Sequence, residues 1–398
     1  MSRTDTAGTA TWFPGIEALR GIAAMAVVVH HSWSLSNQPR FRGYWIVEGF
    51  GTFGVDLFFL LSGFLLSETF WKPQRASLRV YAIRRFFRIA PAYYVNVVIL
   101  FLFFANTSIL LSKQGLRQTV MSGTFMQYLF PDTSSSLNVN GALWTLTIEV
   151  MLYAFLPFMA LSFRASPRLA FLVFVGVGVG WRLFIAMNGD WIRALYFGSE
   201  PGLPEGIKSL FLARQFIGAL PVFAVGIGAR WALQNARLPV KDWLAKRRLG
   251  VMRFVLLLVP GVMFLRFIEE ASDYRNAMLF AVYDFVLVVL LVPALVVAAQ
   301  SEALVPSALR RLATWLGERS YSIYLWHFPL ILVLYGRGPL EGPAPEDRYV
   351  PRLIMIFALT LVFAAVSYRA VEAPGQAWGR RVARLIRPRP ASTRGDQL

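Results

Sequence analysis

Apolar segments long enough to cross a lipid bilayer recur along this 398-residue chain, and they limit what it can fold into. A helix needs about 20 apolar residues to span the hydrocarbon core. Hydrophobic residues make up 56% of the chain and charged residues 16%, a balance that one large soluble core does not explain. The sequence therefore predicts an all-α, polytopic membrane bundle of about ten helices. The expected spans are residues 15–35, 50–71, 92–111, 144–163, 169–187, 210–233, 251–268, 278–299, 321–335 and 350–371.

The basic residues between these segments predict how the bundle sits in the membrane. With the N-terminus in the cytoplasm, 26 of the 40 Lys and Arg residues fall on the cytoplasmic side and 9 on the outer side. This bias follows the positive-inside rule, so we expect both termini in the cytoplasm and a multi-pass protein of the inner (plasma) membrane. The expected organisation is a cytoplasmic segment over 1–14, a transmembrane domain over 15–375 and a disordered basic cytoplasmic tail over 376–398. No signal-peptide pattern precedes the first span, which we expect to stay uncleaved.

Charge and cysteine content restrict the chemistry further. The net charge is +18, but the cations lie in short loops between apolar runs. That placement favours contact with anionic lipid headgroups over binding to nucleic acid. The chain has no cysteine, which excludes disulfides, thiol nucleophiles and thiolate metal sites. No spacing of His, Asp and Glu is typical of a metal site, and we expect none.

The first apolar segment carries ionisable side chains, which are costly inside a membrane and are therefore candidates for function. Arg20 and His31 are 11 residues apart. On a helix this spacing places both on one face, separated by about 16 Å along the axis. His30 points about 100° away from that face. The segment predicts a cation near one membrane surface and an imidazole near the other, both facing the bundle interior.

Two carboxylates in later spans are expected at the depth of His31. Asp56 in the second span and Glu149 in the fourth both lie in the outer halves of helices that run inward. An imidazole beside a carboxylate suits a general base whose tautomer is fixed and whose cation is stabilised. The same residues are compatible with a buried polar network that only fixes helix packing, or with pairing to intramembrane arginines.

Arginines are expected at both ends of the bundle. A basic cluster opens the third span at the inner surface and consists of Arg84, Arg85 and Arg88. It suits phosphate groups, and it suits lipid headgroups equally. The arginines near outer helix ends are Arg182, Arg214 and Arg266. They are interpreted either as partners of Asp284 or as donors to an anionic or polyhydroxylated acceptor, with Arg214 the most interesting of them.

The ninth span places three polar aromatic side chains near mid-membrane. Tyr321, Tyr324 and His327 follow one another at i, i+3 and i+6, so they form one stripe along a helix. We interpret this stripe as a pocket wall, with structural packing as the alternative.

Several short motifs, in this order and spacing, resemble those of acyltransferase family 3, a family of integral membrane O-acyltransferases. The resemblance covers residues 17–374. The motif residues are Arg20 and His31; Gly54, Asp56, Ser62 and Gly63; Arg84, Arg85, Arg88, Pro91 and Tyr93; Trp144, Glu149, Tyr153 and Pro157; Ser320, Tyr324, His327 and Pro329; and Tyr368, Glu372 and Pro374. Each motif alone is weak, but their shared order is specific.

The resemblance implies transfer of an acyl group, expected to be acetyl, from cytoplasmic acyl-CoA to a hydroxyl of an acceptor. The acceptor it implies is a sugar of a cell-surface glycan, with no tightly bound cofactor. We expect His31 to act as general base or as a transient acyl carrier, oriented by Asp56 or Glu149. Arg84, Arg85 and Arg88 are expected to hold the CoA phosphates, with Arg20 lining the path of its pantetheine arm. The residues expected to bind substrate are Trp144, Tyr324, His327 and Arg214.

Other functions are compatible with the same residues. Within the enzyme class, a macrolide antibiotic or a lipid is the alternative acceptor. A transporter would use the same buried charges without catalysing a reaction. A non-catalytic membrane scaffold is the third alternative, and it predicts that substitution of His31 has no effect.

Overall fold

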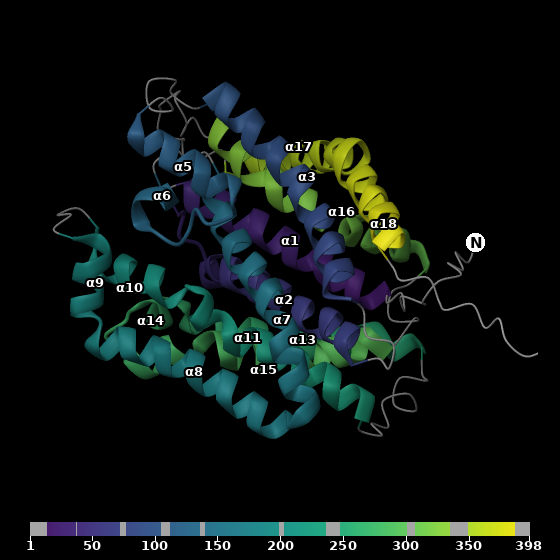
Figure 1. Ribbon diagram of the computed structural model, residues 1–398, viewed down its shortest axis with the longest axis horizontal. Coiled ribbons are helices and arrows are strands. Elements are labelled where there is room, and N and C mark those ends of the chain that lie inside the picture. Colours follow the sequence, from purple (N-terminus) through teal and green to yellow (C-terminus); the bar gives the residue numbers. More distant parts are fainter. Residues whose placement is uncertain are drawn as a thin grey trace, which may run out of the picture.

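The computed structural model describes residues 14–36, 38–71, 77–104, 112–135, 140–198, 203–235, 247–300, 307–334 and 349–386. Within these ranges the regular structure is helical and no strand is present, which confirms the all-α prediction. The described residues include ten long helices (Figure 1). They are α1 (Pro14–Leu35), α2 (Tyr44–Ser67), α3 (Leu78–Phe104), α7 (Trp144–Ala165), α8 (Pro167–Asn188), α11 (Phe216–Asn235), α13 (Arg247–Phe264), α15 (Ala277–Gln300), α16 (Ser307–Leu334) and α17 (Tyr349–Ser367).

Shorter elements connect the long helices. The short α-helices are α5 (Lys113–Gly123), α6 (Pro131–Ser135), α9 (Asp190–Phe197), α10 (Glu205–Ala213) and α14 (Ile268–Ser272). Three 3₁₀ turns are η1 (Glu68–Phe70), η2 (Gly141–Leu143) and η3 (Leu265–Phe267). After α17 the chain makes a π-helical turn, η5 (Tyr368–Glu372), and continues into α18 (Ala373–Ile386).

Each of the ten expected spans overlaps one of the ten long helices. Within the described residues, seven helices are long and apolar enough to cross a membrane. They begin at Tyr44, Leu78, Gly141, Pro167, Phe216, Ala277 and Tyr349. Helix α1 is not among them, because Glu17, Arg20 and two histidines lower its mean hydropathy. A count of about ten spans, with both termini in the cytoplasm, stays a prediction.

Helix α1 lies in the middle of the bundle and packs most extensively against α16 and α2 (Figure 1). Glycines allow this part of the bundle to pack closely. A Cβ atom on Gly54 of α2 would lie 2.6 Å from the carbonyl oxygen of Ala23 in α1, and one on Gly317 of α16 would lie 2.3 Å from that of Glu17 in α1. Any larger side chain would push these helices apart. The close approach brings the polar residues of α1 within reach of both neighbours.

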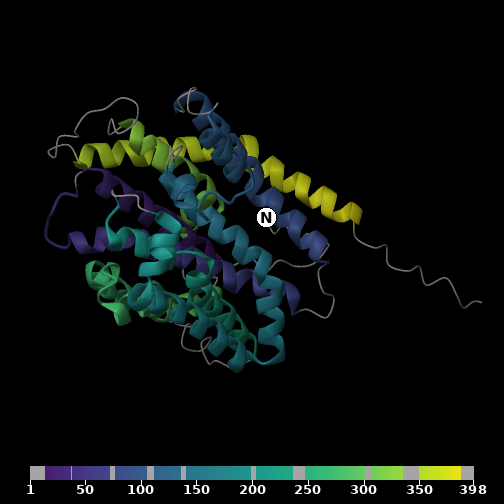
Figure 2. The same cartoon turned by 60° about the vertical axis from the view of Figure 1, so that its left-hand side comes forward.

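The two ends of the bundle differ. Short helices α5, α6, α9, α10 and α14 gather at one end, on the left in Figure 1, while α18 extends past the other end (Figure 2). The expectation of disorder from residue 376 is wrong for residues 376–386, which are helical. The physical reason is packing: Gly379 and Ala383 are buried, and Gly379 lies against Phe87 of α3. Residues 387–398 lie outside the described ranges.

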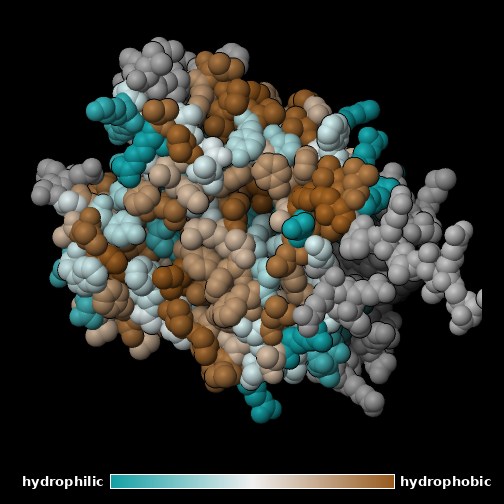
Figure 3. All heavy atoms as spheres, in the orientation of Figure 1, coloured by the Kyte–Doolittle hydropathy of each residue, from teal (hydrophilic) through white to brown (hydrophobic). Residues whose placement is uncertain are grey.

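The outer surface carries the apolar side chains expected of a helix bundle in lipid. Large apolar patches are visible on the face drawn in Figure 3. Helices α8 and α17 expose large apolar residues along their length, among them Leu169, Leu172, Val177, Ile354, Val362 and Val366. Exposed apolar area of this extent favours a membrane environment over water.

Candidate active site

Two adjoining cavities lie inside the bundle. The arginine cavity, named for Arg20, Arg85 and Arg88 on its wall, has a volume of about 370 Å³. The histidine cavity, named for His30 and His31, has a volume of about 190 Å³. The residues that line both cavities are Val55, Phe59 and Tyr324. These three side chains therefore form the wall between the two cavities.

Helix α1 contributes to both cavities. Arg20 lines the arginine cavity and His31 lines the histidine cavity, as their spacing on one helical face predicts. His30 also lines the histidine cavity, and its Nδ1 lies 3.3 Å from the carbonyl oxygen of Val47. A single helix thus carries the cation of one cavity and the imidazole of the other.

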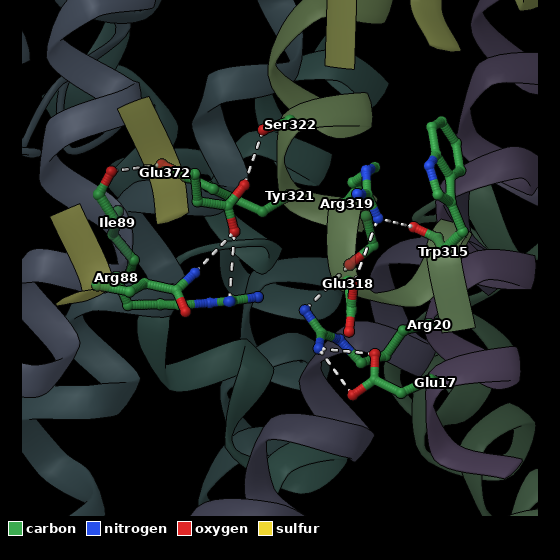
Figure 4. Close-up of polar contacts among 12 residues, drawn as sticks. Glu17, Arg20, Arg88, Ile89, Trp315, Glu318, Arg319, Tyr321, Ser322 and Glu372 are labelled. Carbon is green, nitrogen blue, oxygen red and sulfur yellow. Dashed lines mark hydrogen bonds and ion pairs between the residues drawn. The ribbon is translucent and has the colours of Figure 1, made fainter. Parts of the chain in front are cut away.

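Two of the arginines that line the arginine cavity are held by carboxylates, and one of them also by a hydroxyl (Figure 4). Arg20 forms an ion pair with Glu17 at 3.2 Å and donates a hydrogen bond to Ser320 Oγ at 3.0 Å. Arg88 pairs with Glu372 at 3.3 Å. These contacts fix the guanidinium groups on the cavity wall, where fixed cations suit a polyanionic ligand.

Glu372 is a residue to which the sequence assigned no role, although it belongs to one of the motifs quoted above. It lies in the π-helical turn η5 and is 1% exposed. Besides the ion pair with Arg88, it accepts hydrogen bonds from Ser322 Oγ at 2.7 Å and from Gln376 Nε2 at 3.1 Å (Figure 4). A buried carboxylate with three partners is firmly placed, and it holds Arg88 in turn.

The predicted basic cluster divides between the cavity and the surface. Arg85 and Arg88 line the arginine cavity, and the Arg85 guanidinium lies 5.9 Å from the ring centroid of Tyr153. Arg84 does not line this cavity, and its side chain is exposed. Arg84 and Arg85 point about 100° apart on the helix, which is enough for one to line the cavity while the other faces outward.

Glu149 lies in the arginine cavity and not beside His31. It accepts a hydrogen bond from Tyr153, whose hydroxyl lies 3.4 Å from Ser62 Oγ. Depth along the helix explains the difference from the expectation. Trp144, at the start of α7, lines the histidine cavity, whereas Thr145 already lines the arginine cavity. Because α7 begins at the level of the wall, five residues are enough to carry Glu149 past it.

The hydrogen-bond partner of His31 is another histidine. His31 Nδ1 lies 3.0 Å from His327 Nε2 of α16, and His327 Nδ1 lies 2.7 Å from the carbonyl oxygen of Tyr324. His327 is completely buried and stands behind His31, outside the set of residues that line the two cavities. Neither Asp56 nor Glu149 forms a hydrogen bond with His31 in the part of the chain that the structure describes.

Asp56 lies in the histidine cavity with an unused acceptor. It is 5% exposed, and its Oδ2 has no hydrogen-bond partner among the described residues. Arg182 pairs with Asp284 on the same cavity, as expected for one of the alternatives above. A buried carboxylate oxygen without a partner is costly, and a ligand hydroxyl in the cavity would satisfy it.

The other predicted substrate-binding residues are close to this carboxylate. The Arg214 guanidinium lies 5.2 Å from the ring centroid of Trp144, and both line the histidine cavity. The Tyr324 hydroxyl is held by Thr145 and by the carbonyl oxygen of Ala142. Of the four residues assigned to substrate, three line the histidine cavity and His327 does not. Within the described ranges, no group of three or more His, Asp or Glu side chains is arranged to hold a metal ion.

A proline helps to position this part of α16. Pro329 has no N–H, so the carbonyl oxygen of Leu325, four residues earlier, has no partner within the helix. That oxygen accepts hydrogen bonds from Asn96 Nδ2 at 3.2 Å and from Asn140 Nδ2 at 2.9 Å. Side chains from neighbouring elements satisfy the freed group, as membrane bundles require. They tie the segment with Tyr324 and His327 to α3 and to the turn before α7.

Comparison with known proteins identifies the family of this chain. A family model described as an acyltransferase domain matches residues 13–369, nearly the whole chain. The chain belongs to this acyltransferase family. The resemblance found in the motifs is thereby confirmed. No solved structure matches this acyltransferase.

Two curated relatives of this acyltransferase carry more specific names. It is 28% identical to the peptidoglycan O-acetyltransferase OatA of Listeria monocytogenes, over 94% of this chain and 57% of the relative. It is 25% identical to the O-acetyltransferase OatA of Staphylococcus aureus, over 91% of this chain and 57% of the relative. The chain thus spans a little over half the length of the curated relatives it matches.

Proposed function

We propose that this protein is a membrane O-acyltransferase that moves an acetyl group from acyl-CoA to a hydroxyl of a cell-surface glycan. The observation that carries the proposal is the shared wall between the two cavities. Arginines line one side of it, and His31 with Asp56 lines the other. The names of the two relatives support acetyl as the group, and the name of the Listeria relative supports a peptidoglycan-like glycan as the acceptor.

The arginine cavity is the proposed donor site. CoA carries phosphates on a nucleotide and a narrow pantetheine arm that ends in the thioester. Guanidinium groups bind phosphate through paired, charge-assisted hydrogen bonds, and Arg20, Arg85 and Arg88 supply three of them. The predicted topology places this end of the bundle at the cytoplasmic surface, where acyl-CoA is available. The thioester then reaches the wall while the charged nucleotide stays at the inner end.

The histidine cavity is the proposed site of chemistry. His31 takes the proton of the acceptor hydroxyl, and the hydroxyl oxygen bonds to the carbonyl carbon of the thioester. The carbon–sulfur bond then breaks, and the proton held by His31 goes to the leaving thiolate of CoA. Asp56 accepts a hydrogen bond from a second hydroxyl of the acceptor through its unused oxygen. Donor and acceptor therefore meet without charged CoA crossing the membrane.

The test is acyl transfer by the purified protein in lipid. Acetyl-CoA labelled in the acetyl group is supplied with peptidoglycan fragments, a macrolide or a membrane lipid as acceptor. We expect label to appear on the glycan as an ester that mild base removes. Label on the macrolide or the lipid alone would overturn the glycan assignment. Acetyl-CoA left intact with every acceptor, under conditions in which the protein is folded, would reject the enzyme class.

A further inference from the structure

Two hydrogen bonds link His31 to His327 and His327 to the backbone of α16, and the chemistry of the partners determines which atom donates in each. The chain has only three histidines, and two of them, His31 and His327, meet across the interface of α1 and α16. Their rings are 5.1 Å apart between centroids, with an angle of 34° between the planes. Phe328 meets the His31 ring edge-on at 5.1 Å. The imidazole of His31 is therefore held on two sides.

The proton positions follow from the chemistry of the partners. The carbonyl oxygen of Tyr324 can only accept a hydrogen bond, so His327 Nδ1 must carry the hydrogen of their 2.7 Å contact. A neutral imidazole has one N–H, which leaves His327 Nε2 with a lone pair. His31 Nδ1 must then donate in the 3.0 Å contact between the two rings. This assignment comes from the hydrogen-bond network and leaves the lone pair of His31 on Nε2.

We propose that His327 is a positioning residue that selects the Nδ1–H tautomer of His31 and leaves His31 Nε2 as the basic atom. In water a neutral histidine side chain favours the opposite tautomer, with its hydrogen on Nε2. An acceptor at Nδ1 reverses that preference, and a carboxylate or a backbone carbonyl usually supplies it. Here a neutral imidazole lies at Nδ1, itself fixed by the backbone of α16, and the backbone carbonyl of Val27 in α1 is a second hydrogen-bond acceptor for the ring.

The catalytic consequence rests on the function proposed above, whereas the tautomer does not. With the hydrogen on Nδ1, the free lone pair of His31 is available to take the proton of an acceptor hydroxyl. With the hydrogen on Nε2, that atom could only donate a hydrogen bond and could not take a proton from the acceptor. His327 thus acts on the reaction through His31, and touches neither donor nor acceptor in this arrangement.

Nitrogen-15 NMR of the full-length protein in lipid tests the tautomer directly. Selective ¹⁵N-histidine labelling gives three imidazoles, and the variants His30→Ala and His31→Ala assign them. We expect the wild-type His31 and His327 signals to show a protonated Nδ1 and an unprotonated Nε2. A wild-type His31 with its proton on Nε2 would overturn the proposal, whatever any variant does.

Two substitutions of His327 separate positioning from packing. Gln places an amide oxygen near the position of Nε2 and can accept from His31 Nδ1, whereas Leu fills similar space and cannot accept. We expect His327→Gln to keep the His31 tautomer and most of the activity. His327→Leu should shift His31 toward Nε2–H and lower kcat roughly tenfold or more, with KM for acetyl-CoA unchanged.

Equal loss in both variants would assign His327 to packing alone and overturn its positioning role. The expected tautomer in a wild-type protein that transfers no acetyl group would refute the proposed function and leave the tautomer inference standing.

Discussion

The two cavities differ in the polar groups that line them. In the arginine cavity three arginines line the wall together with Glu149, and Arg20 and Arg88 are held by Glu17 and Glu372. In the histidine cavity, Arg182 and Asp284 form an ion pair with each other. Among the described residues, the carboxylate oxygens on this cavity without a partner belong to Asp56 and Glu48, and the imidazole of His31 lines the same cavity.

This difference suits the arginine cavity to binding of the donor and the histidine cavity to the chemical step. Fixed cations held by ion pairs contribute affinity for a polyanion, and that contribution is the same in the ground state and the transition state. An imidazole with a defined tautomer contributes only while a proton moves. Substitutions in the arginine cavity should therefore act on KM for the donor, those in the histidine cavity on kcat, and those in the wall on the choice of acyl group.

The largest effect is expected from His31→Ala. Loss of a general base lowers a rate by about 100- to 10,000-fold, so we expect kcat for acetyl transfer to fall at least about 100-fold. The measurement is the initial rate with labelled acetyl-CoA, with thermal unfolding recorded to confirm that the variant is folded. His30→Ala is the matched control, because His30 lines the same cavity and precedes His31 in the same helix. Equal rates for the two variants would assign the base to another residue.

A smaller effect is expected from Arg85→Gln in the arginine cavity. A hydrogen bond to a charged group contributes about 1.5–3 kcal/mol, so KM for acyl-CoA should rise roughly ten- to a hundredfold while kcat changes little. Arg84→Gln removes the same charge from the adjacent residue, whose side chain is exposed away from the cavity. A KM that rises equally in both variants would indicate a general electrostatic effect, and an unchanged KM in Arg85→Gln would assign the cluster to lipid.

The positions of Arg20 and His31 could be predicted from sequence because one helix carries both. Helical geometry alone fixes their common face and their separation, and each lines the cavity at its own end. The helices themselves were predictable for a similar reason, since apolar length is a local property. Glu17 and Arg20 pair at i,i+3, which the sequence also shows.

The partner of His31 could not be predicted in the same way. His327 lies 296 residues further along the chain, and its contact depends on how α1 and α16 rotate against each other. Depth in the membrane suggested carboxylates instead: the sequence predicts that α7 begins at residue 144, but not that this start lies at the level of the wall between the cavities. Trp144 and Glu149 differ by little more than one helical turn, yet they line different cavities. An error of about one helical turn in depth therefore decides which residues share a site.

The smallest effect is expected at the wall, from Val55→Ala. If the donor enters from the arginine cavity and the acceptor lies in the histidine cavity, the acyl group must pass between Val55, Phe59 and Tyr324. One methylene in an apolar pocket discriminates by about 1–3 kcal/mol at most, and a half-buried valine supplies part of that. We expect the ratio of kcat/KM for butyryl-CoA to that for acetyl-CoA to rise a few-fold.

Leu65→Ala is the matched control for this prediction, because Leu65 lies on the same helix, is also half-buried and lines only the arginine cavity. It should leave the butyryl-to-acetyl ratio unchanged, even if it lowers stability by a comparable amount. A ratio that shifts equally in both variants would mean that the whole arginine cavity, and not the wall alone, discriminates between acyl groups of different length. A shift confined to Val55→Ala would place the acyl group at the wall, within reach of the imidazole of His31.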